Sequence, residues 1–331
     1  MQDIIFAINA VMPIILMIIV GYILKKIHLL DEENAKKLNT LVFRVFLPVM
    51  LFLNVYKIES FAKIDFTFVF YAVGITVLLF AIGIPVMHIL FKENRQRSVM
   101  LQGIFRANYA LVGIPLAESL FGVEGSIMAS LLSAFVVPVF NILAVICLTI
   151  YSSSDKKPSL SGVLKGVAKN PLIQGIFCGL VALGIRALFV KFNIDFRLTD
   201  LTPIYKTLSN LSSVATPLSL LVLGARFEFS SIPALKKHII LATINRVIIV
   251  PFIGISCAIL LNSLNLTNFT GAQFATFVAC FCTPVAVSSV PMSQEMGADA
   301  ELMGQIVVWT TVFSAFSIFI ASYILKVIGI F

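Results

Sequence analysis

The 331-residue sequence has little charge. Asp, Glu, Lys and Arg make up 12% of it, whereas soluble globular chains carry roughly 25%. Hydrophobic residues make up 59%, and the mean hydropathy is +1.03. Because water cannot solvate a surface built from this composition, we exclude a soluble globular protein and expect an integral membrane protein.

Residue patterns that carry enzymatic chemistry are also missing. The sequence contains no HExxH metal motif, no GxSxG nucleophile elbow and no GxxxxGK[ST] phosphate-binding loop. Its histidines, His28, His88 and His238, fall at the ends of apolar blocks or between them. We therefore expect neither an enzyme nor an ATP-driven pump, and no metal or other cofactor beyond a coupling Na⁺ or H⁺.

Cysteine is scarce too, and all five cysteines lie inside apolar blocks. Disulfide bonds are therefore not expected. Cys280 and Cys282 have the wrong spacing for a CxxC redox or zinc motif, so the cysteines are interpreted as small packing residues.

Long apolar runs are what the sequence does contain. A hydrocarbon core of ~30 Å takes about 20 helical residues. The first run precedes the first lysine, Lys25, so it lacks the positive stretch of a cleaved signal and is expected to remain as a helix. Ten spans are predicted near 4–24, 38–56, 66–91, 98–120, 126–150, 171–190, 202–224, 238–261, 269–294 and 302–325.

A polar stretch at 152–170 divides these runs into two sets of five and is the expected cytoplasmic linker. We therefore expect one repeat at 1–151 and a second at 171–331, which is inverted because five is an odd number. Pro48 and Pro217 fall in matching spans, and LFGVEGSIM at 120–128 matches EMGADAELM at 295–303. Inverted repeats are typical of secondary transporters, which bind substrate at the repeat interface.

Lys and Arg are shared unequally between the loops. Fourteen lie in 25–37, 92–97, 156–169 and 226–237, and seven lie in 57–63 and 186–206 and at 326. Because basic residues resist translocation, we expect a multi-pass protein of the cytoplasmic membrane with both termini extracytoplasmic. The net charge of +8 is then an orientation signal that also attracts anionic membrane lipids, and nucleic acid is not an expected partner.

Two spans carry helix-breaking residues near their middles. They read FRANYALVGIPLAESLFG at 105–122, in the fourth span, and FCTPVAVSSVPMSQEMG at 281–297, in the ninth. Interrupted helices in matching places of two halves indicate a binding site, where free helix N-termini attract a carboxylate. The alternative is an ordinary proline kink in each span. The breaking residues are Asn108, Gly113 and Pro115 in the fourth span and Pro284 and Pro291 in the ninth.

Three arginines, Arg44, Arg106 and Arg246, fall within or near apolar spans. A cation inside the membrane is costly, so each is a candidate for function. Arg106 lies two residues before Asn108 and could attract an anion. The alternative for all three is that the side chain reaches the membrane surface. Glu118, the one acid expected at membrane depth, could pair with an arginine, carry a proton or meet water.

Uncharged polar residues complete the candidate site. Thr283, Ser288 and Ser289 lie at the second break and could donate hydrogen bonds to a carboxylate, or else bind neighbouring helices. Asn54 and Asn141 are amides inside other spans and are weaker candidates.

A GxxxG pair, Gly175 and Gly179, lies in the sixth span. Small residues at this spacing let two membrane helices approach closely. We expect a close helix contact here rather than a ligand site.

The fourth span resembles the first crossover of the auxin efflux carrier (AEC) family, through Asn108, GIPL at 113–116, Phe121 and Gly122. The ninth span and the residues after it are similar to the second crossover of that family. The matching residues there are Pro284, Ala286, Glu295, Gly297, Asp299, Glu301, Leu302, Thr310, Thr311 and Ser314. The resemblance covers essentially the whole chain.

This resemblance implies an all-α membrane fold of about ten transmembrane helices, built as two inverted five-helix repeats. A transport domain that holds the broken crossover helices, spans 4 and 9, moves against a scaffold domain. Plant PIN-type members export the auxin anion, and bacterial members are commonly assigned malate, malonate or other carboxylates. Asn108 and Pro115 match the first crossover and Pro284 the second. Tyr109 replaces a small polar residue of the plant members, and the linker is short, which argues against auxin itself.

The leading hypothesis is a carrier that moves a small organic anion, malate- or malonate-like or auxin-like, by alternating access. Alternatives are a Na⁺- or H⁺-coupled symporter or antiporter of the related bile-acid-symporter-like fold, a membrane-embedded enzyme, and a receptor that does not transport. A homodimer is left open. Expected substrate contacts are Arg106, Asn108, Tyr109, Gly113, Pro115, Thr283, Pro284, Ser288 and Ser289, with weaker candidates at Asn54, Glu118, Asn141 and Pro291.

Overall fold

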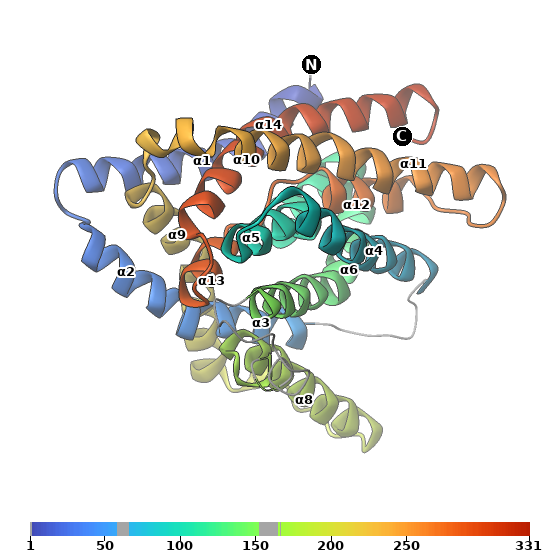
Figure 1. Ribbon diagram of the computed structural model, residues 1–331. Coiled ribbons are helices and arrows are strands. Elements are labelled where there is room, and N and C mark those ends of the chain that lie inside the picture. Colours follow the sequence, from blue (N-terminus) through green and yellow to red (C-terminus); the bar gives the residue numbers. More distant parts are fainter. Residues whose placement is uncertain (1, 58–65, 152–164, 166) are drawn as a thin grey trace.

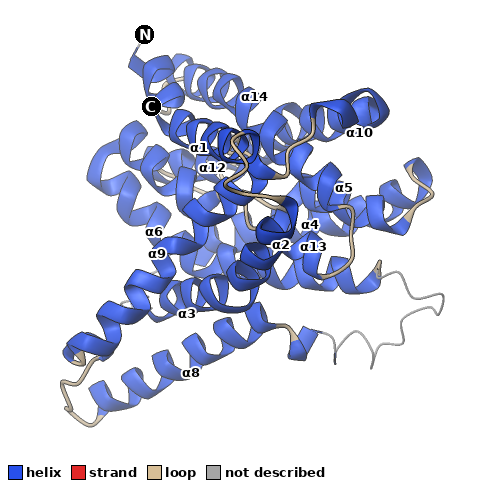
Figure 2. Cartoon of the chain, turned by 90° about the vertical axis from the view of Figure 1, so that its left-hand side faces the viewer, coloured by secondary structure: helices blue, strands red, loops and turns tan. Residues whose placement is uncertain are grey.

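The computed structural model describes residues 2–57, 66–151, 165 and 167–331, so most of the linker expected at 152–170 lies outside the described residues. The described residues are helical almost throughout and form no β-strand beyond one isolated bridge (Figures 1 and 2). This confirms the all-α prediction.

The helices of the first half follow the predicted runs, with two π-helical turns, η1 and η2, inserted. In chain order they are α1 (Gln2–Lys26), α2 (Glu32–Leu41), η1 (Val42–Phe46), α3 (Leu47–Tyr56), α4 (Phe66–Leu90), α5 (Asn94–Phe105), η2 (Tyr109–Gly113) and α6 (Ile114–Ile150).

The second half contains one further π-helical turn, η5, and two short 3₁₀ turns. Its elements are α8 (Pro171–Lys191), η3 (Leu198–Asp200), α9 (Thr202–Ala225), η4 (Phe229–Ser231), α10 (Ile232–Ile244), η5 (Asn245–Ile249), α11 (Val250–Ser263), α12 (Gly271–Phe281), α13 (Ser289–Glu295) and α14 (Ala300–Val327).

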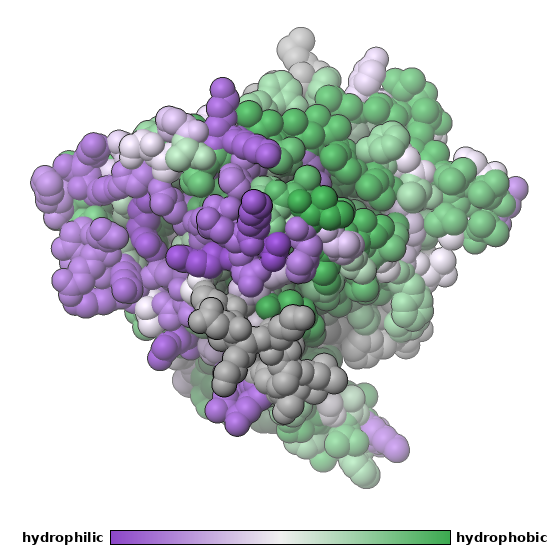
Figure 3. All heavy atoms as spheres, viewed as in Figure 1, coloured by the Kyte–Doolittle hydropathy of each residue, from purple (hydrophilic) through white to green (hydrophobic). Residues whose placement is uncertain are grey.

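Seven helical segments of the described chain are long and apolar enough to cross a membrane. Their outer surfaces expose large apolar side chains such as Phe70, Ile89 and Phe252, which are 70–82% exposed. Hydrophilic residues gather instead on the side of the molecule where α2 lies (Figure 3). Such a surface is stable in lipid and not in water, so the chain is a multi-pass membrane protein. The segments are Glu32–Tyr56, Phe66–Leu90, Tyr109–Ile150, Pro171–Lys191, Thr202–Ala225, Phe229–Ser263 and Ala300–Val327.

The helices pack as two groups. In the first group, α3 packs against α8 and α9, α9 packs against α1, and α2 continues into α3. In the second group, α6 packs against α12 and α4, and α10 packs against α14. We call these the first helix group (α1, α2, α3, α8 and α9) and the second helix group (α4, α5, α6 and α10 to α14). They meet where α1 contacts α14 and α6, and where η1 contacts α13.

Close glycine contacts hold the first helix group together. A methyl group on Gly175 would lie 2.4 Å from the carbonyl oxygen of Pro48, and one on Gly179 would lie 2.8 Å from Cβ of Val55. This confirms the predicted close contact at the GxxxG pair and assigns its partner, α3. Gly224 of α9 approaches the carbonyl oxygen of Ile18 in α1 even more closely.

Short helices and a bend distinguish the second helix group. Helix α12 has 11 residues and is therefore only about 16 Å long, roughly half the thickness of a hydrocarbon core. Helix α6 bends at Phe121 and Gly122, where Gly122 has φ +60° and ψ −149°, a conformation that a side chain would disfavour. The bend lies between the runs predicted at 98–120 and 126–150.

Candidate functional site

Both of the segments expected to break are interrupted. Helix α5 ends at Phe105 and the helical path resumes at Tyr109, while α12 ends at Phe281 and α13 begins at Ser289. Prolines and a glycine surround these gaps, and they disfavour continuous helix because proline lacks a donor and restricts the residue before it.

The two interruptions lie side by side. Ala107 and Val285 form an isolated antiparallel bridge, and the backbone N–H of Asn108 donates to the carbonyl oxygen of Pro284 at 2.8 Å. Thr310 Oγ1 of α14 accepts a further hydrogen bond from Val285 N. Irregular backbone survives inside a membrane only where it is buried in protein or lines a cavity, and these contacts meet that condition.

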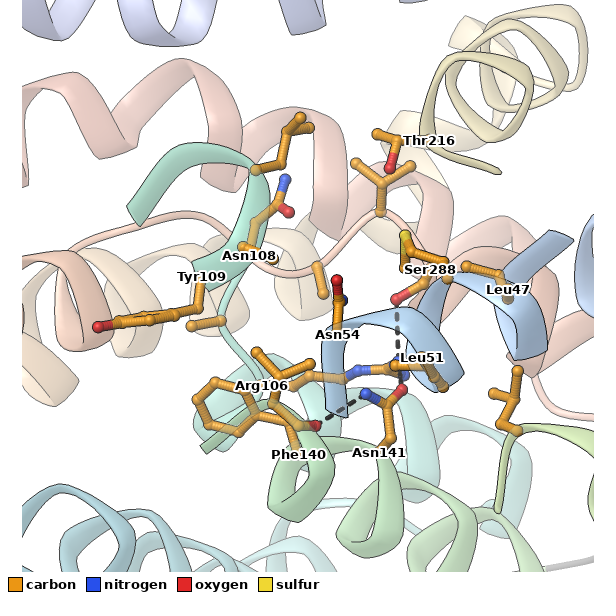
Figure 4. Close-up of a pocket in the computed structure, with 18 of the residues that line it drawn as sticks. Leu47, Leu51, Asn54, Arg106, Asn108, Tyr109, Phe140, Asn141, Thr216 and Ser288 are labelled. Atoms are coloured by element: carbon orange, nitrogen blue, oxygen red, sulfur yellow. Dashed lines mark hydrogen bonds between the residues drawn. The ribbon is translucent and has the colours of Figure 1, made fainter. Parts of the chain in front are cut away.

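A cavity of about 240 Å³ opens beside the crossing of the two interruptions (Figure 4). Both helix groups line it. The lining residues are Leu47, Met50, Leu51 and Asn54 of α3, Arg106 to Leu111 of the first interruption and η2, Val137, Phe140 and Asn141 of α6, Leu172 of α8, Thr216 and Ser219 of α9, and Ala286, Val287 and Ser288 of the second interruption.

Arg106 is the charged group of this cavity. It is 1% exposed, and its guanidinium donates to Gln102 Oε1 at 2.9 Å. It also donates to Asn141 Oδ1 at 2.8 Å and to Ser288 Oγ at 2.9 Å (Figure 4). None of the ion pairs among the described residues involves Arg106. A guanidinium held by neutral partners keeps its full positive charge for a ligand.

Asn108 offers an unused hydrogen-bond donor. It is 8% exposed, it lines the cavity, and its side-chain Nδ2 has no hydrogen-bond partner among the described residues. Because a buried polar group normally finds a partner, this donor is suited to an acceptor atom of a bound molecule.

Six of the candidates predicted from the sequence line the cavity, namely Arg106, Asn108, Tyr109, Ser288, Asn54 and Asn141. The ring of Tyr109 points away from Arg106 (Figure 4). Its hydroxyl donates to the carbonyl oxygen of Ala129.

The other candidates lie outside the lining. They are Gly113, Pro115, Glu118, Thr283, Pro284, Ser289 and Pro291. Thr283 donates within its own segment to the carbonyl oxygen of Ala279. Glu118 is exposed and accepts a hydrogen bond from Ser126. None of the ion pairs among the described residues involves it. Of the remaining residues, Pro284 lies within the second interruption, Gly113 and Pro115 follow the first, and Ser289 and Pro291 lie in α13.

Arg246 is buried inside the protein, so its side chain does not reach outward as the alternative from the sequence required. It is 1% exposed and donates to three backbone carbonyl oxygens near the crossing. Arg44 differs from the other two arginines, since its side chain is 70% exposed and lies 3.9 Å from a carboxylate oxygen of Glu295.

Of the residues that the first helix group contributes to the cavity, sequence reasoning found Asn54 and missed the others. Leu47 and Thr216 line the cavity on helices that run through without a gap. One signal was present: each of these residues directly precedes one of the matched prolines, Pro48 and Pro217. The paired prolines thus marked α3 and α9, two of the three first-group helices that line the cavity.

Comparison with known proteins decides the family. A family model described as membrane transport protein matches residues 6–322, nearly the whole chain. The chain belongs to the AEC family of membrane transport proteins. This confirms the resemblance read from the two interrupted segments and identifies a transporter rather than an enzyme.

Two archaeal relatives of this AEC family member match over almost their full lengths. The chain is 26% identical to the uncharacterized transporter MJ1031 of Methanocaldococcus jannaschii over 328 residues, 96% of this chain and 98% of the relative. It is 22% identical to an uncharacterized transporter of Methanothermobacter thermautotrophicus over 324 residues, again 96% of this chain and 98% of the relative.

Proposed function

We propose that this AEC family member is a secondary carrier that moves a small carboxylate anion across the cytoplasmic membrane by alternating access. The observation that carries the proposal is Arg106, a buried cation that faces the cavity with neutral partners only among the described residues. In the same cavity, Asn108 supplies an amide donor that has no partner among the described residues. No residue of the described chain that lines the cavity is acidic, so the site favours an anion over a cation.

We further propose that the architecture is ten spans in two inverted five-helix repeats, 1–151 and 171–331. The fourth span then consists of α5, η2 and the first part of α6, up to the bend at Gly122, and the ninth consists of α12 and α13. In this scheme the first helix group is the scaffold and the second is the transport domain. The fourteen basic residues of the odd-numbered loops support an orientation with both termini outside.

The size of the cavity favours a small substrate. A cavity of about 240 Å³ holds a mono- or dicarboxylate of a few carbon atoms, and it falls below the roughly 300–1,000 Å³ of sites for drug-sized ligands. Met50, Leu51 and Phe140 provide apolar walls. A malate- or malonate-like anion therefore fits this conformation better than a bulky aromatic one.

Uptake by the purified full-length protein in liposomes tests this function. Labelled mono- and dicarboxylates are offered under an imposed membrane potential, and we expect saturable flux toward the positive side. Replacing the cation by Arg106→Gln should lower flux roughly 10- to 100-fold, the value of one hydrogen-bonded charge.

Arg44→Gln is the matched control, because Arg44 also lies in an apolar span but has an exposed side chain. It should keep most of the flux. Absence of saturable flux for every carboxylate offered, or an equal loss in both arginine variants, would refute the assignment of Arg106 to an anion site.

A further inference from the structure

The second buried arginine, Arg246, binds the backbone of both interrupted helices. Its Nε donates to the carbonyl oxygen of Thr283 at 2.8 Å, and its terminal nitrogens donate to those of Cys280 at 3.0 Å and Ile104 at 3.2 Å. It lies on the π-helical turn η5, between α10 and α11. One side chain thus joins the ends of α5 and α12.

Two of these carbonyl groups belong to helix C-termini, and the third, that of Thr283, follows the end of α12. Helix α5 ends at Phe105 and α12 ends at Phe281, so Ile104 and Cys280 lie in last turns, where carbonyl oxygens have no partner within the helix. Each helix C-terminus carries roughly −0.5 of an elementary charge, so two of them amount to about −1. The guanidinium supplies the matching +1.

The partial negative charge of backbone carbonyl oxygens balances the positive charge of Arg246. None of the ion pairs among the described residues involves it, and its side chain is 1% exposed. Its hydrogen-bond partners among the described residues are all backbone carbonyl oxygens, whereas Arg106 binds side-chain amide and hydroxyl oxygens. Arg106 lines the cavity and Arg246 does not. The two cations therefore have different surroundings and different roles.

Clustered carbonyl oxygens at the ends of broken membrane helices are the groups with which secondary transporters bind a coupling Na⁺. In this chain a guanidinium already uses those oxygens. We infer that Arg246 is a built-in cation that takes the place of a coupling cation at this crossing, so that the carrier works without Na⁺. The inference rests on the proposed carrier function. A guanidinium also keeps its proton at any physiological pH, so Arg246 cannot serve as an H⁺ carrier.

The first test uses the unmodified protein in liposomes. Carboxylate flux is measured with Na⁺ replaced by choline at constant ionic strength, and then with Na⁺ or pH gradients imposed at zero membrane potential. We expect the rate to change less than about twofold and no uphill accumulation by either gradient. Uphill accumulation driven by Na⁺ or H⁺ would overturn the inference while leaving the carrier function intact.

The second test needs no flux, so it stands even if the proposed function fails. Removal of the side chain in Arg246→Ala leaves the carbonyl oxygens without their cation. We expect the purified variant to unfold at a lower temperature in choline chloride than the unmodified protein. Low millimolar guanidinium chloride, or NaCl, should restore part of the loss with a saturable rise in Tm.

Arg44→Ala is the control, since its side chain is exposed, and it should show no saturable rise with either salt. If Arg246→Ala does not fold, Arg246→Lys replaces it, because an ammonium group binds fewer of the three oxygens and should give an intermediate Tm that guanidinium raises. A variant whose Tm is lowered but responds to neither cation would show a purely structural arginine and overturn the inference.

Discussion

At the scale of single residues, hydrogen bonds to neighbouring residues hold the polar side chains of the cavity in place. Asn141 illustrates this arrangement: its Nδ2 donates to the carbonyl oxygen of Val137, which turns its Oδ1 toward Arg106. Arg106 is thereby held in place without losing its charge. A pre-oriented site of this kind loses little entropy when an anion binds.

Asn108→Ala tests the free amide donor. The backbone hydrogen bond from Asn108 N to the carbonyl oxygen of Pro284 does not need the side chain, so the variant should fold normally. Loss of the Nδ2 donor should reduce carboxylate flux in liposomes roughly 10-fold or more, because a buried acceptor on the substrate would be left unpaired. Size-exclusion chromatography checks folding.

Asn210→Ala, an exposed position on α9, provides the comparison and should transport at the normal rate. Undiminished flux in Asn108→Ala would remove Asn108 from the site.

The residues of the interruptions were predictable from the sequence, and the surroundings of Arg246 were not. Arg106, Asn108 and Ser288 stand beside prolines and glycines that mark a break in any helix. The environment of Arg246 depends on carbonyl groups that lie 34 to 142 residues away along the chain. No local pattern records such a contact, so the residue was compatible with a surface position until the packing was known.

At the scale of elements, the lengths of the helices were predictable but their local winding was not. The length of each apolar run predicts the length of its span, and Gly122 marks the bend in α6. The π-helical turns η1, η2 and η5 have no sequence signature, because each arises when one extra residue is fitted into a packed helix. Two of them adjoin the cavity, since η1 precedes Leu47 and η2 follows Asn108, and the third, η5, carries Arg246 at the ends of the interrupted helices.

Helix α8 offers a test of close packing between elements. In Gly175→Ala, the new methyl group would lie 2.4 Å from the carbonyl oxygen of Pro48, so α3 and α8 must separate, at a cost of about 1–3 kcal/mol. In Gly184→Ala, on the same helix, nothing lies within 4 Å, and the gain in helix propensity should be about 0.5–1 kcal/mol.

Thermal unfolding of the purified proteins in detergent should therefore move in opposite directions, with Gly175→Ala less stable and Gly184→Ala slightly more stable. Equal shifts of the same sign would mean that the contact between α3 and α8 is looser than the distances indicate.

At the scale of the whole molecule, the cavity lies between the two helix groups, since α3, α8 and α9 line it from one side and α6 and both interruptions from the other. A shift of one group against the other would therefore change access to Arg106. One contact between the groups, at α13, includes hydrogen bonds from α2: Thr40 Oγ1 donates to Glu295 Oε1 at 2.7 Å, and Asn39 Nδ2 donates to the carbonyl oxygen of Pro291 at 3.5 Å. This contact must break if the groups move.

Cross-linking across that boundary tests the movement. In a protein whose less buried cysteines, Cys178 and Cys257, are replaced by alanine, the pair Thr40→Cys and Glu295→Cys is bridged by a short, cleavable bifunctional thiol reagent. Because the bridge ties the first helix group to the second, flux in liposomes should stop and return after cleavage.

The pair Ser231→Cys and Gln305→Cys is the control: these residues form a 3.0 Å hydrogen bond within the second group, so bridging them should leave flux intact. Full flux through the bridged Thr40–Glu295 pair would mean that the boundary does not move during transport and that the two groups act as one rigid body.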